Sequence, residues 1–136
     1  MNDLISKWSG YGPYFQSFLR MVAGAMFMLS GTMLLFGFPA FAPGMTSAPP
    51  LISQMGIGGI LLVGGGALML LGLFTRPVAF VLSGMMAVAY FQFHQPRGFW
   101  PQLNGGVDAA LYCFLWLYFS AAGPGPLSID AMRDKK

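Results

Sequence analysis

The sequence predicts an all-α membrane protein, a bundle of four transmembrane helices whose N- and C-termini are both cytoplasmic. Hydrophobic residues make up 56% of the 136 positions and charged residues only 8%, whereas a soluble domain carries about a quarter charged residues. The mean hydropathy of +0.64 points the same way. Too few polar side chains are present to cover a surface that faces water, so we expect lipid to be the surrounding solvent.

Each apolar stretch approaches the roughly 20 residues that a helix needs to cross the hydrocarbon core, where backbone polar groups must be bonded within the segment. We expect spans at about 14–36, 51–74, 77–93 and 103–121, within a single domain covering residues 1–136. Pro77 suits the first turn of the third span because its missing N–H would be unpaired there anyway. Residues 74–76 are therefore expected to form a tight turn before it.

After the fourth span, Gly123-Pro124-Gly125-Pro126 should stop the helix. Ser128 is then expected to cap a short amphipathic tail helix within residues 127–136. At the other end of the chain, a cleaved signal peptide is the competing interpretation of the first span, since Arg20 precedes an apolar stretch and Ala40-Phe41-Ala42 resembles a cleavage site. We expect this segment to be retained.

The basic residues predict the orientation, because short cytoplasmic flanks of membrane spans are enriched in Lys and Arg. One side of the predicted bundle would carry Lys7, Arg20, Arg76, Arg133, Lys135 and Lys136, and the other side Arg97 alone. Arg20 and Arg76 are accordingly expected to serve topology or lipid anchoring. The same scatter of single basic residues argues against nucleic-acid binding despite the net charge of +3.

Glycines recur along the predicted second span. Gly58, Gly65 and Gly72 are spaced by seven residues, with Gly59 and Gly66 beside them. Small residues allow helix backbones to approach closely in lipid, where van der Waals packing drives association. We expect Gly58, Gly65 and Gly72 to be helix-packing positions.

Ionisable side chains inside a membrane span cost about 3 kcal/mol or more, so those that occur suggest function. His94 follows Tyr90 by four residues, and Asp108 is four residues from both Asn104 and Tyr112, which predicts shared helical faces at the outer end of the bundle. The full predicted polar site comprises Tyr90, His94, Asn104, Asp108, Tyr112, Arg97, Trp100 and Ser30.

Two interpretations of this polar site remain open. An imidazole, a carboxylate and tyrosine hydroxyls beside aromatic walls would suit a quinone headgroup, whose carbonyls need hydrogen-bond donors and whose reduction consumes protons. Alternatively, Asp108 pairs with Arg97 or His94 and only holds the outer loop in place. No metal site is predicted, because one histidine and one cysteine cannot supply a zinc or iron–sulfur ligand set.

Ten short motifs, in order, resemble those of one family. They are Leu19-Arg20, Phe36-Gly37-Phe38-Pro39, Gly64-Gly65-Gly66, Gly72-Leu73-Phe74-Thr75-Arg76, Ala89-Tyr90-Phe91 with His94 and Pro96, Gly98-Phe99-Trp100-Pro101, Asn104-Gly105-Gly106, Leu111-Tyr112, Ala122-Gly123-Pro124-Gly125 and Ser128-Ile129-Asp130. Over about residues 18–130 the chain resembles the DoxX family of small bacterial inner-membrane proteins with four spans. The resemblance implies a multi-pass protein of the bacterial inner membrane.

The resemblance also implies membrane redox chemistry, since relatives include a subunit of thiosulfate:quinone oxidoreductase and a partner in a thiol-related oxidoreductase complex. Many relatives have His-Gly and then Lys near the end of the first span, where this chain has Ser30-Gly31 and Leu34. Many relatives also have Glu in the second span, about where this chain has Leu62. Acidity is kept only at Asp108, so we do not expect catalysis by the chain alone.

The expected function is an accessory or quinone-proximal subunit of a membrane oxidoreductase system. We expect no cofactor to be bound by this chain alone, and quinone is the one candidate. The alternative is a noncatalytic structural subunit that packs against a larger respiratory or photosynthetic complex. Expected partners are the lipid bilayer and either other membrane subunits or further copies of the chain. Small-solute transport is a weaker alternative, because no inverted repeat is evident.

Overall fold

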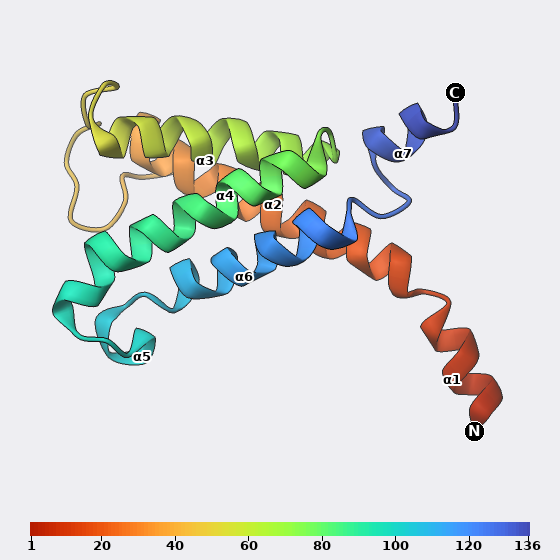
Figure 1. Ribbon diagram of the computed structural model, residues 1–136. Coiled ribbons are helices and arrows are strands. Elements are labelled where there is room, and N and C mark those ends of the chain that lie inside the picture. Colours follow the sequence, from red (N-terminus) through yellow and green to blue (C-terminus); the bar gives the residue numbers. More distant parts are fainter. The chain divides into compact units, whose positions relative to one another are not determined.

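The computed structural model describes all residues from Met1 to Lys136, which form helices and no strands (Figure 1). The elements are α1 (Asn2–Ser9), α2 (Gly12–Phe36), α3 (Gln54–Leu71), α4 (Thr75–Ala89), the π-helix η1 (Tyr90–His94), the 3₁₀ helix η2 (Gln95–Arg97), α5 (Pro101–Asn104), α6 (Val107–Ala122) and α7 (Ile129–Asp134). They divide into two compact units, one of residues Met1–Thr75 with Pro124–Lys136 and one of residues Arg76–Gly123.

Three helical segments, Gly12–Phe36, Gln54–Leu71 and Thr75–Arg97, are long and apolar enough to cross a membrane. Helix α6 is apolar but shorter, with 16 residues. The prediction of an all-helical, multi-pass membrane protein is therefore confirmed. The crossing of the fourth helix and the cytoplasmic location of the termini stay predictions.

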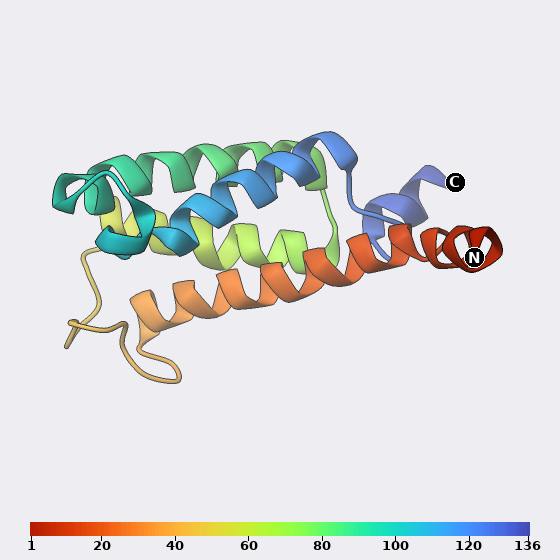
Figure 2. The same cartoon turned by 90° about the horizontal axis from the view of Figure 1, so that it is seen from below.

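In the first unit, α2 and α3 run antiparallel side by side, with glycines at the contact (Figures 1 and 2). A Cβ atom added at Gly66 would lie 2.6 Å from the backbone nitrogen of Met28, and one at Gly24 would lie 2.7 Å from that of Leu70. Farther along, a Cβ at Gly31 would lie 2.7 Å from the nitrogen of Val63. The two backbones approach too closely at these points for any side chain.

The face of α3 that contacts α2 lies next to the face that we predicted. A Cβ at Gly58 would meet no atom within 4 Å, whereas one at Gly59 would lie 2.6 Å from Leu35 Cδ2. Gly65 is buried in the interior, and Gly72 ends α3 with a φ of +70° rather than packing within it. A seven-residue spacing shows that glycines share one face of a helix. It does not show which of two adjacent glycine faces contacts the partner helix.

Local signals set the ends of α3. The Ser53 hydroxyl accepts a hydrogen bond from the Gly56 N–H at 3.1 Å, which begins the helix. At the other end, the left-handed conformation of Gly72 stops it. The second span is consequently shorter than the predicted 51–74. The turn that we placed at residues 74–76 lies instead at 72–74, because α4 already begins at Thr75.

Within the first unit, Arg20 of α2 joins the C-terminal segment to the end of α3. Its guanidinium is fully buried and donates hydrogen bonds to the carbonyls of Leu70 at 2.9 Å, Pro124 at 2.9 Å and Leu127 at 2.6 Å, and to that of Met69. We predicted a headgroup or topology anchor; this guanidinium is instead enclosed by protein carbonyls. Its environment favours a structural role within the unit.

The tail helix predicted after the fourth span is present. The Ser128 hydroxyl accepts a hydrogen bond from the Ala131 N–H at 3.1 Å and so caps α7. The same side chain lies against the end of α3, where a Cβ at Gly72 would come within 2.4 Å of Ser128 Cβ. Capping of the tail by Ser128 is therefore confirmed.

In the second unit, α4 and α6 run antiparallel. The Ser83 hydroxyl donates to the carbonyl of Cys113 at 2.7 Å, and the Arg76 guanidinium donates to the carbonyl of Ala121. Trp116 and Phe119 of α6 are completely buried. The fourth span, predicted as 103–121, starts only at Val107.

Candidate functional site

The connection between η1 and α6 is held by the side chains of Tyr90 and Asn104. The Asn104 amide donates to the carbonyl of Gly98 at 2.7 Å and to the Tyr90 hydroxyl at 3.2 Å, and its oxygen accepts from the Gly106 N–H at 2.8 Å. The Tyr90 hydroxyl in turn donates to the carbonyl of Phe99. Since Asn104 is only 3% exposed, these bonds satisfy a polar side chain that water hardly reaches.

Glycines make this connection possible. Gly105 adopts a φ of +74°, which ends α5 and turns the chain towards α6. At Gly106 a Cβ would lie 2.8 Å from Tyr90 Cε2 and 2.9 Å from His94 Cβ. The beginning of α6 can therefore lie directly against η1.

His94 belongs to the same cluster. Its Nδ1 is 3.3 Å from the carbonyl oxygen of Asn104. Its ring stacks on that of Tyr90, with ring centroids 6.3 Å apart and an interplanar angle of 29°. Tyr90, His94 and Asn104, three of the predicted site residues, are thus brought together, and their contacts fasten the connection.

The remaining predicted polar residues do not join this cluster. Asp108 is exposed in the first turn of α6, where a carboxylate interacts favourably with the helix dipole. It forms no ion pair with Arg97 or His94, so the loop-pinning pair of the alternative interpretation is absent. Asn104 and Asp108 also lie on different helices, because Gly105 separates them, and the shared face that we predicted is wrong.

Three other predicted residues have different surroundings. The ring of Tyr112 stacks on that of Trp116, with centroids 5.8 Å apart. Ser30 lies on α2, in the other unit, and its hydroxyl donates to the carbonyl of Met26 at 3.1 Å. Trp100 is 64% exposed and contacts Phe99 edge to face, with centroids 5.4 Å apart.

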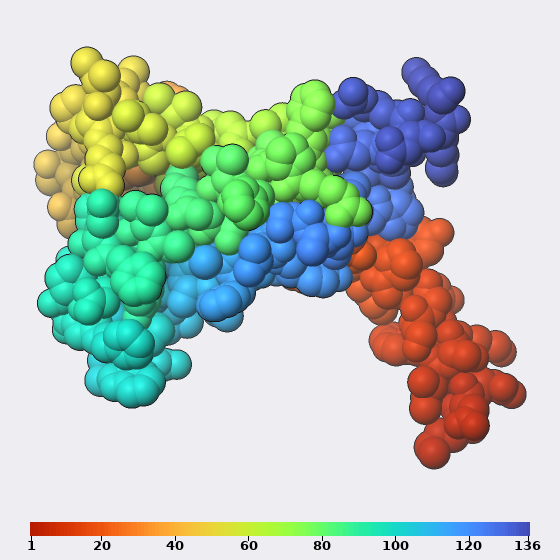
Figure 3. All heavy atoms as spheres, viewed as in Figure 1, coloured from red at the N-terminus to blue at the C-terminus, as the bar shows by residue number.

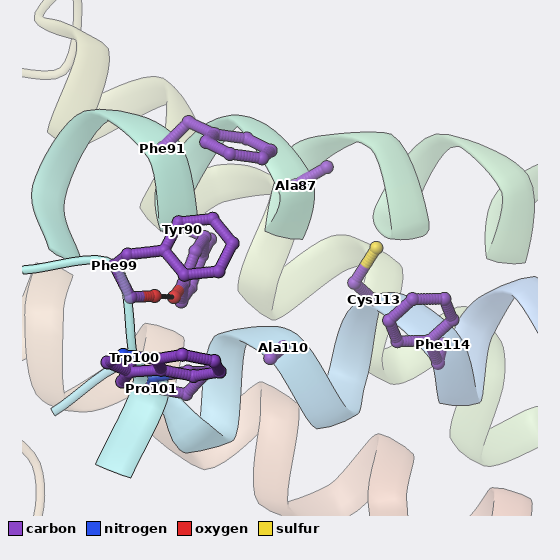
Figure 4. A pocket seen from close by; sticks show the side chains of 9 residues that line it. All are labelled: Ala87, Tyr90, Phe91, Phe99, Trp100, Pro101, Ala110, Cys113 and Phe114. Atoms are coloured by element: carbon purple, nitrogen blue, oxygen red, sulfur yellow. Dashed lines mark hydrogen bonds between the residues drawn. The ribbon is translucent and has the colours of Figure 1, made fainter. Parts of the chain in front are cut away.

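Next to the cluster, the second unit contains an apolar pocket of about 320 Å³ (Figure 4). Aromatic rings and a thiol make up most of its wall: Tyr90, Phe91, Phe99, Trp100, Cys113 and Phe114. The small side chains of Ala87 and Ala110 leave the space open. Figure 4 shows that the one hydroxyl in the wall, on Tyr90, is already bonded to the carbonyl of Phe99.

Among the residues of the pocket wall, only Tyr90 and Trp100 were predicted as site residues from the sequence. A signal for the others was present: Ala87 and Phe91 are four residues apart, and Ala110 precedes Phe114 by four, so each pair shares a helical face. In an apolar span such pairs are not distinguishable from ordinary lipid-facing or packed positions. A search confined to polar residues therefore missed the pocket.

Comparison with known proteins assigns the sequence to a family. The model of the DoxX family matches residues 15–95, more than half of the chain. The chain belongs to the DoxX family. The resemblance inferred from the motifs is thereby confirmed. This DoxX-family chain is also 42% identical over 132 residues to an uncharacterized protein of Haemophilus influenzae, covering 93% of the chain and 96% of that relative. No solved structure is significantly similar to it.

Proposed function

We propose that this DoxX-family protein is an accessory, quinone-proximal subunit of a membrane oxidoreductase system, and that its apolar pocket holds the ring of a lipid-soluble quinone. The observation that carries the proposal is the aromatic wall of the pocket between α4 and α6. Flat, apolar rings bind favourably against aromatic faces. The volume of about 320 Å³ lies near the lower end of small-molecule sites, which suits one ring and the start of its tail.

The state of the polar groups argues for an accessory role rather than catalysis by this chain. Reduction of a quinone needs hydrogen-bond donors at its carbonyls and a source of protons. The Tyr90 hydroxyl and the Asn104 amide are already bonded to backbone and to each other. Asp108, the acidic residue that we expected near the headgroup, is exposed and outside the pocket wall. Electrons and protons would come from a partner subunit.

Four membrane crossings and cytoplasmic termini complete the proposal. The 16 residues of α6 extend about 24 Å at 1.5 Å per residue, against a hydrocarbon core of about 30 Å. A slightly short helix crosses when the bilayer thins around it, at a modest free-energy cost. The distribution of Lys and Arg supports the cytoplasmic location of both termini. The membrane would be the inner membrane of a bacterium.

The test is quinone retention by the protein purified in mild detergent from its native membranes. We expect quinone in the purified protein, and loss of most of it when Ala110→Phe fills the pocket. Leu111→Phe is the matched control, because Leu111 is 65% exposed on the same helix and is not part of the pocket wall. Equal quinone content in both variants, or none in the unmodified protein, would overturn the assignment of the pocket.

The noncatalytic structural subunit remains the second candidate. Its support is that the Tyr90 hydroxyl and the Asn104 amide use their donor hydrogens on each other and on backbone carbonyls, so neither is left to donate to a ligand. Under this alternative, the protein would migrate with a larger complex on native gels. Deleting it would then lower the amount of complex, and turnover per complex would stay unchanged. Reduced quinone turnover per complex favours the first candidate.

A further inference from the structure

Residues before the first span form an amphipathic helix that the functions above do not use. On a helix with 100° per residue, the side chains of Leu4, Ile5 and Trp8 fall on one side. Tyr11 and Phe15 continue the same stripe into the next turns. The opposite side of α1 carries its polar residues, Asn2, Asp3, Ser6, Lys7 and Ser9.

Nothing in the chain covers this stripe. Helix α1 has no buried residue, and the exposed fractions are 74% for Leu4, 57% for Ile5 and 69% for Trp8. Figure 3 shows the side chains of this segment as the red spheres at the N-terminal end. The rings of Trp8 and Phe15 contact each other, with centroids 5.6 Å apart, and Trp8 also contacts Tyr11 at 6.2 Å. An aromatic cluster therefore joins α1 to the start of α2.

The polar side, in contrast, needs no partner protein. The Ser6 hydroxyl donates to the carbonyl of Asp3 at 3.0 Å, and the Ser9 hydroxyl donates to that of Ile5 at 2.8 Å. Lys7 remains exposed. This side is suited to water and lipid headgroups.

Chain connectivity fixes where the stripe can lie. Only Gly10 and Tyr11 separate α1 from α2, and both residues have right-handed helical conformations. The length and hydropathy of α2 allow it to cross the membrane. Helix α1 must therefore stay close to the point where α2 enters the hydrocarbon. Trp and Tyr side chains concentrate at this depth, because each has an apolar ring and one polar atom.

We propose that α1 is an interfacial helix that lies in the headgroup region, with Leu4, Ile5 and Trp8 inserted into lipid and Lys7 towards water. The size of α1 favours lipid over a protein as the occupant of this face. Eight residues span about 12 Å, which is too small for the roughly 800 Å² per partner of a stable protein interface. A short helix with one apolar side binds a bilayer surface in this way.

The experiment uses spin labels on the full-length protein, one copy per lipid nanodisc, in a Cys113→Ala background. Labels at Leu4→Cys and Ser6→Cys report opposite sides of the same exposed helix. We expect the ratio of oxygen to nickel-complex collision rates to be about threefold or more higher at position 4 than at position 6. Ready access of the nickel complex to both labels would place α1 in water and overturn the proposal. Protection of both labels from both reagents would also overturn it, by indicating a protein contact.

Discussion

The carboxylate of Asp130 accepts a hydrogen bond from the backbone N–H of Thr75 at 2.8 Å, across 55 residues of sequence. Its second oxygen accepts from the Phe74 N–H at 2.9 Å. A tail residue thereby satisfies two backbone donors where α4 begins, which a helix start cannot satisfy by itself. Together with the carbonyls that Arg20 binds, this bond ties the C-terminal segment to the end of α3.

Replacing Asp130 with asparagine should loosen this tail. The amide keeps one acceptor but loses the charge, and we expect a loss of about 1 kcal/mol in tail docking because the site is partly solvated. Hydrogen exchange of residues 124–136 in nanodiscs measures the effect. Asp134→Asn, in the exposed last turn of α7, should leave exchange unchanged. Equal exchange in both variants would contradict the role of Asp130.

Docking of the tail should also depend on pH. Partial burial opposes ionisation of Asp130, but the backbone N–H groups of Thr75 and Phe74 and the charge of Arg133 outweigh it, so the pKa lies below its ordinary value. A lowered pKa contributes stability that is fully present above the ordinary carboxyl pKa of about 4 and is lost as the pH falls through the folded value. Proteolysis of the tail should accelerate below about pH 4, and Asp130→Asn should remove this acceleration.

Arg20 should be more important for stability than any exposed basic residue. Arg20→Lys keeps the charge but cannot reach the carbonyls of Leu70, Pro124 and Leu127 together, because an ammonium lacks the planar fork of donors. We expect a loss of about 3 kcal/mol in the free energy of unfolding. Thermal unfolding in detergent measures it, with Arg97→Lys as the exposed control. Equal midpoints for the two variants would show that Arg20 acts at the membrane surface instead.

Alanine at Gly66 should separate α2 from α3. The added Cβ would lie 2.6 Å from the nitrogen of Met28, so the backbones must move, at a cost of about 1–3 kcal/mol. Gly58→Ala is the matched control on the same helix, where the Cβ meets nothing within 4 Å. The free energy of unfolding of the control variant should be unchanged or slightly higher, since alanine favours helix formation. Unfolding midpoints that shift equally in both variants would contradict the observed packing face.

Composition and hydropathy were sufficient to predict an all-helical membrane fold, since a span in lipid must satisfy its own backbone. Helix ends were less predictable. The start of α4 at Thr75 depends on Asp130, which lies 55 residues later in the sequence, and a local pattern does not contain that bond. The packing side of α3 likewise depends on Gly24 and Gly31 of α2. These two glycines are also spaced by seven residues, a signal that we did not use.

The candidate site was predicted only in part, for a chemical reason. Polar residues stand out in a membrane sequence, so Tyr90, His94 and Asn104 were singled out correctly as neighbours. Their bonds are nevertheless directed inwards, to Gly98, Phe99 and Gly106, and this could not be seen without the turns at Gly105 and η1. The pocket itself is made of residue types that are common throughout the chain.

Removing the Asn104 amide should open the connection between η1 and α6. Asn104→Ala eliminates three hydrogen bonds of the buried side chain, which should cost about 2–3 kcal/mol, and leaves the Gly106 N–H with only its longer bond to the carbonyl of Pro101. Hydrogen exchange of residues 98–106 is expected to rise, while exchange of α2 and α3 should not change. The control is Gln102→Ala, an exposed residue of the same short helix. Unaltered exchange over residues 98–106 would contradict the role of Asn104 in holding this connection.

The most direct test of the account is to locate a photoreactive quinone analogue on the protein in native membranes by mass spectrometry. The account predicts crosslinks to the pocket wall, at Phe91, Trp100 and Phe114, and their loss in Ala110→Phe but not in Leu111→Phe. Crosslinks spread over the lipid-facing surface, unchanged by filling the pocket, would contradict it.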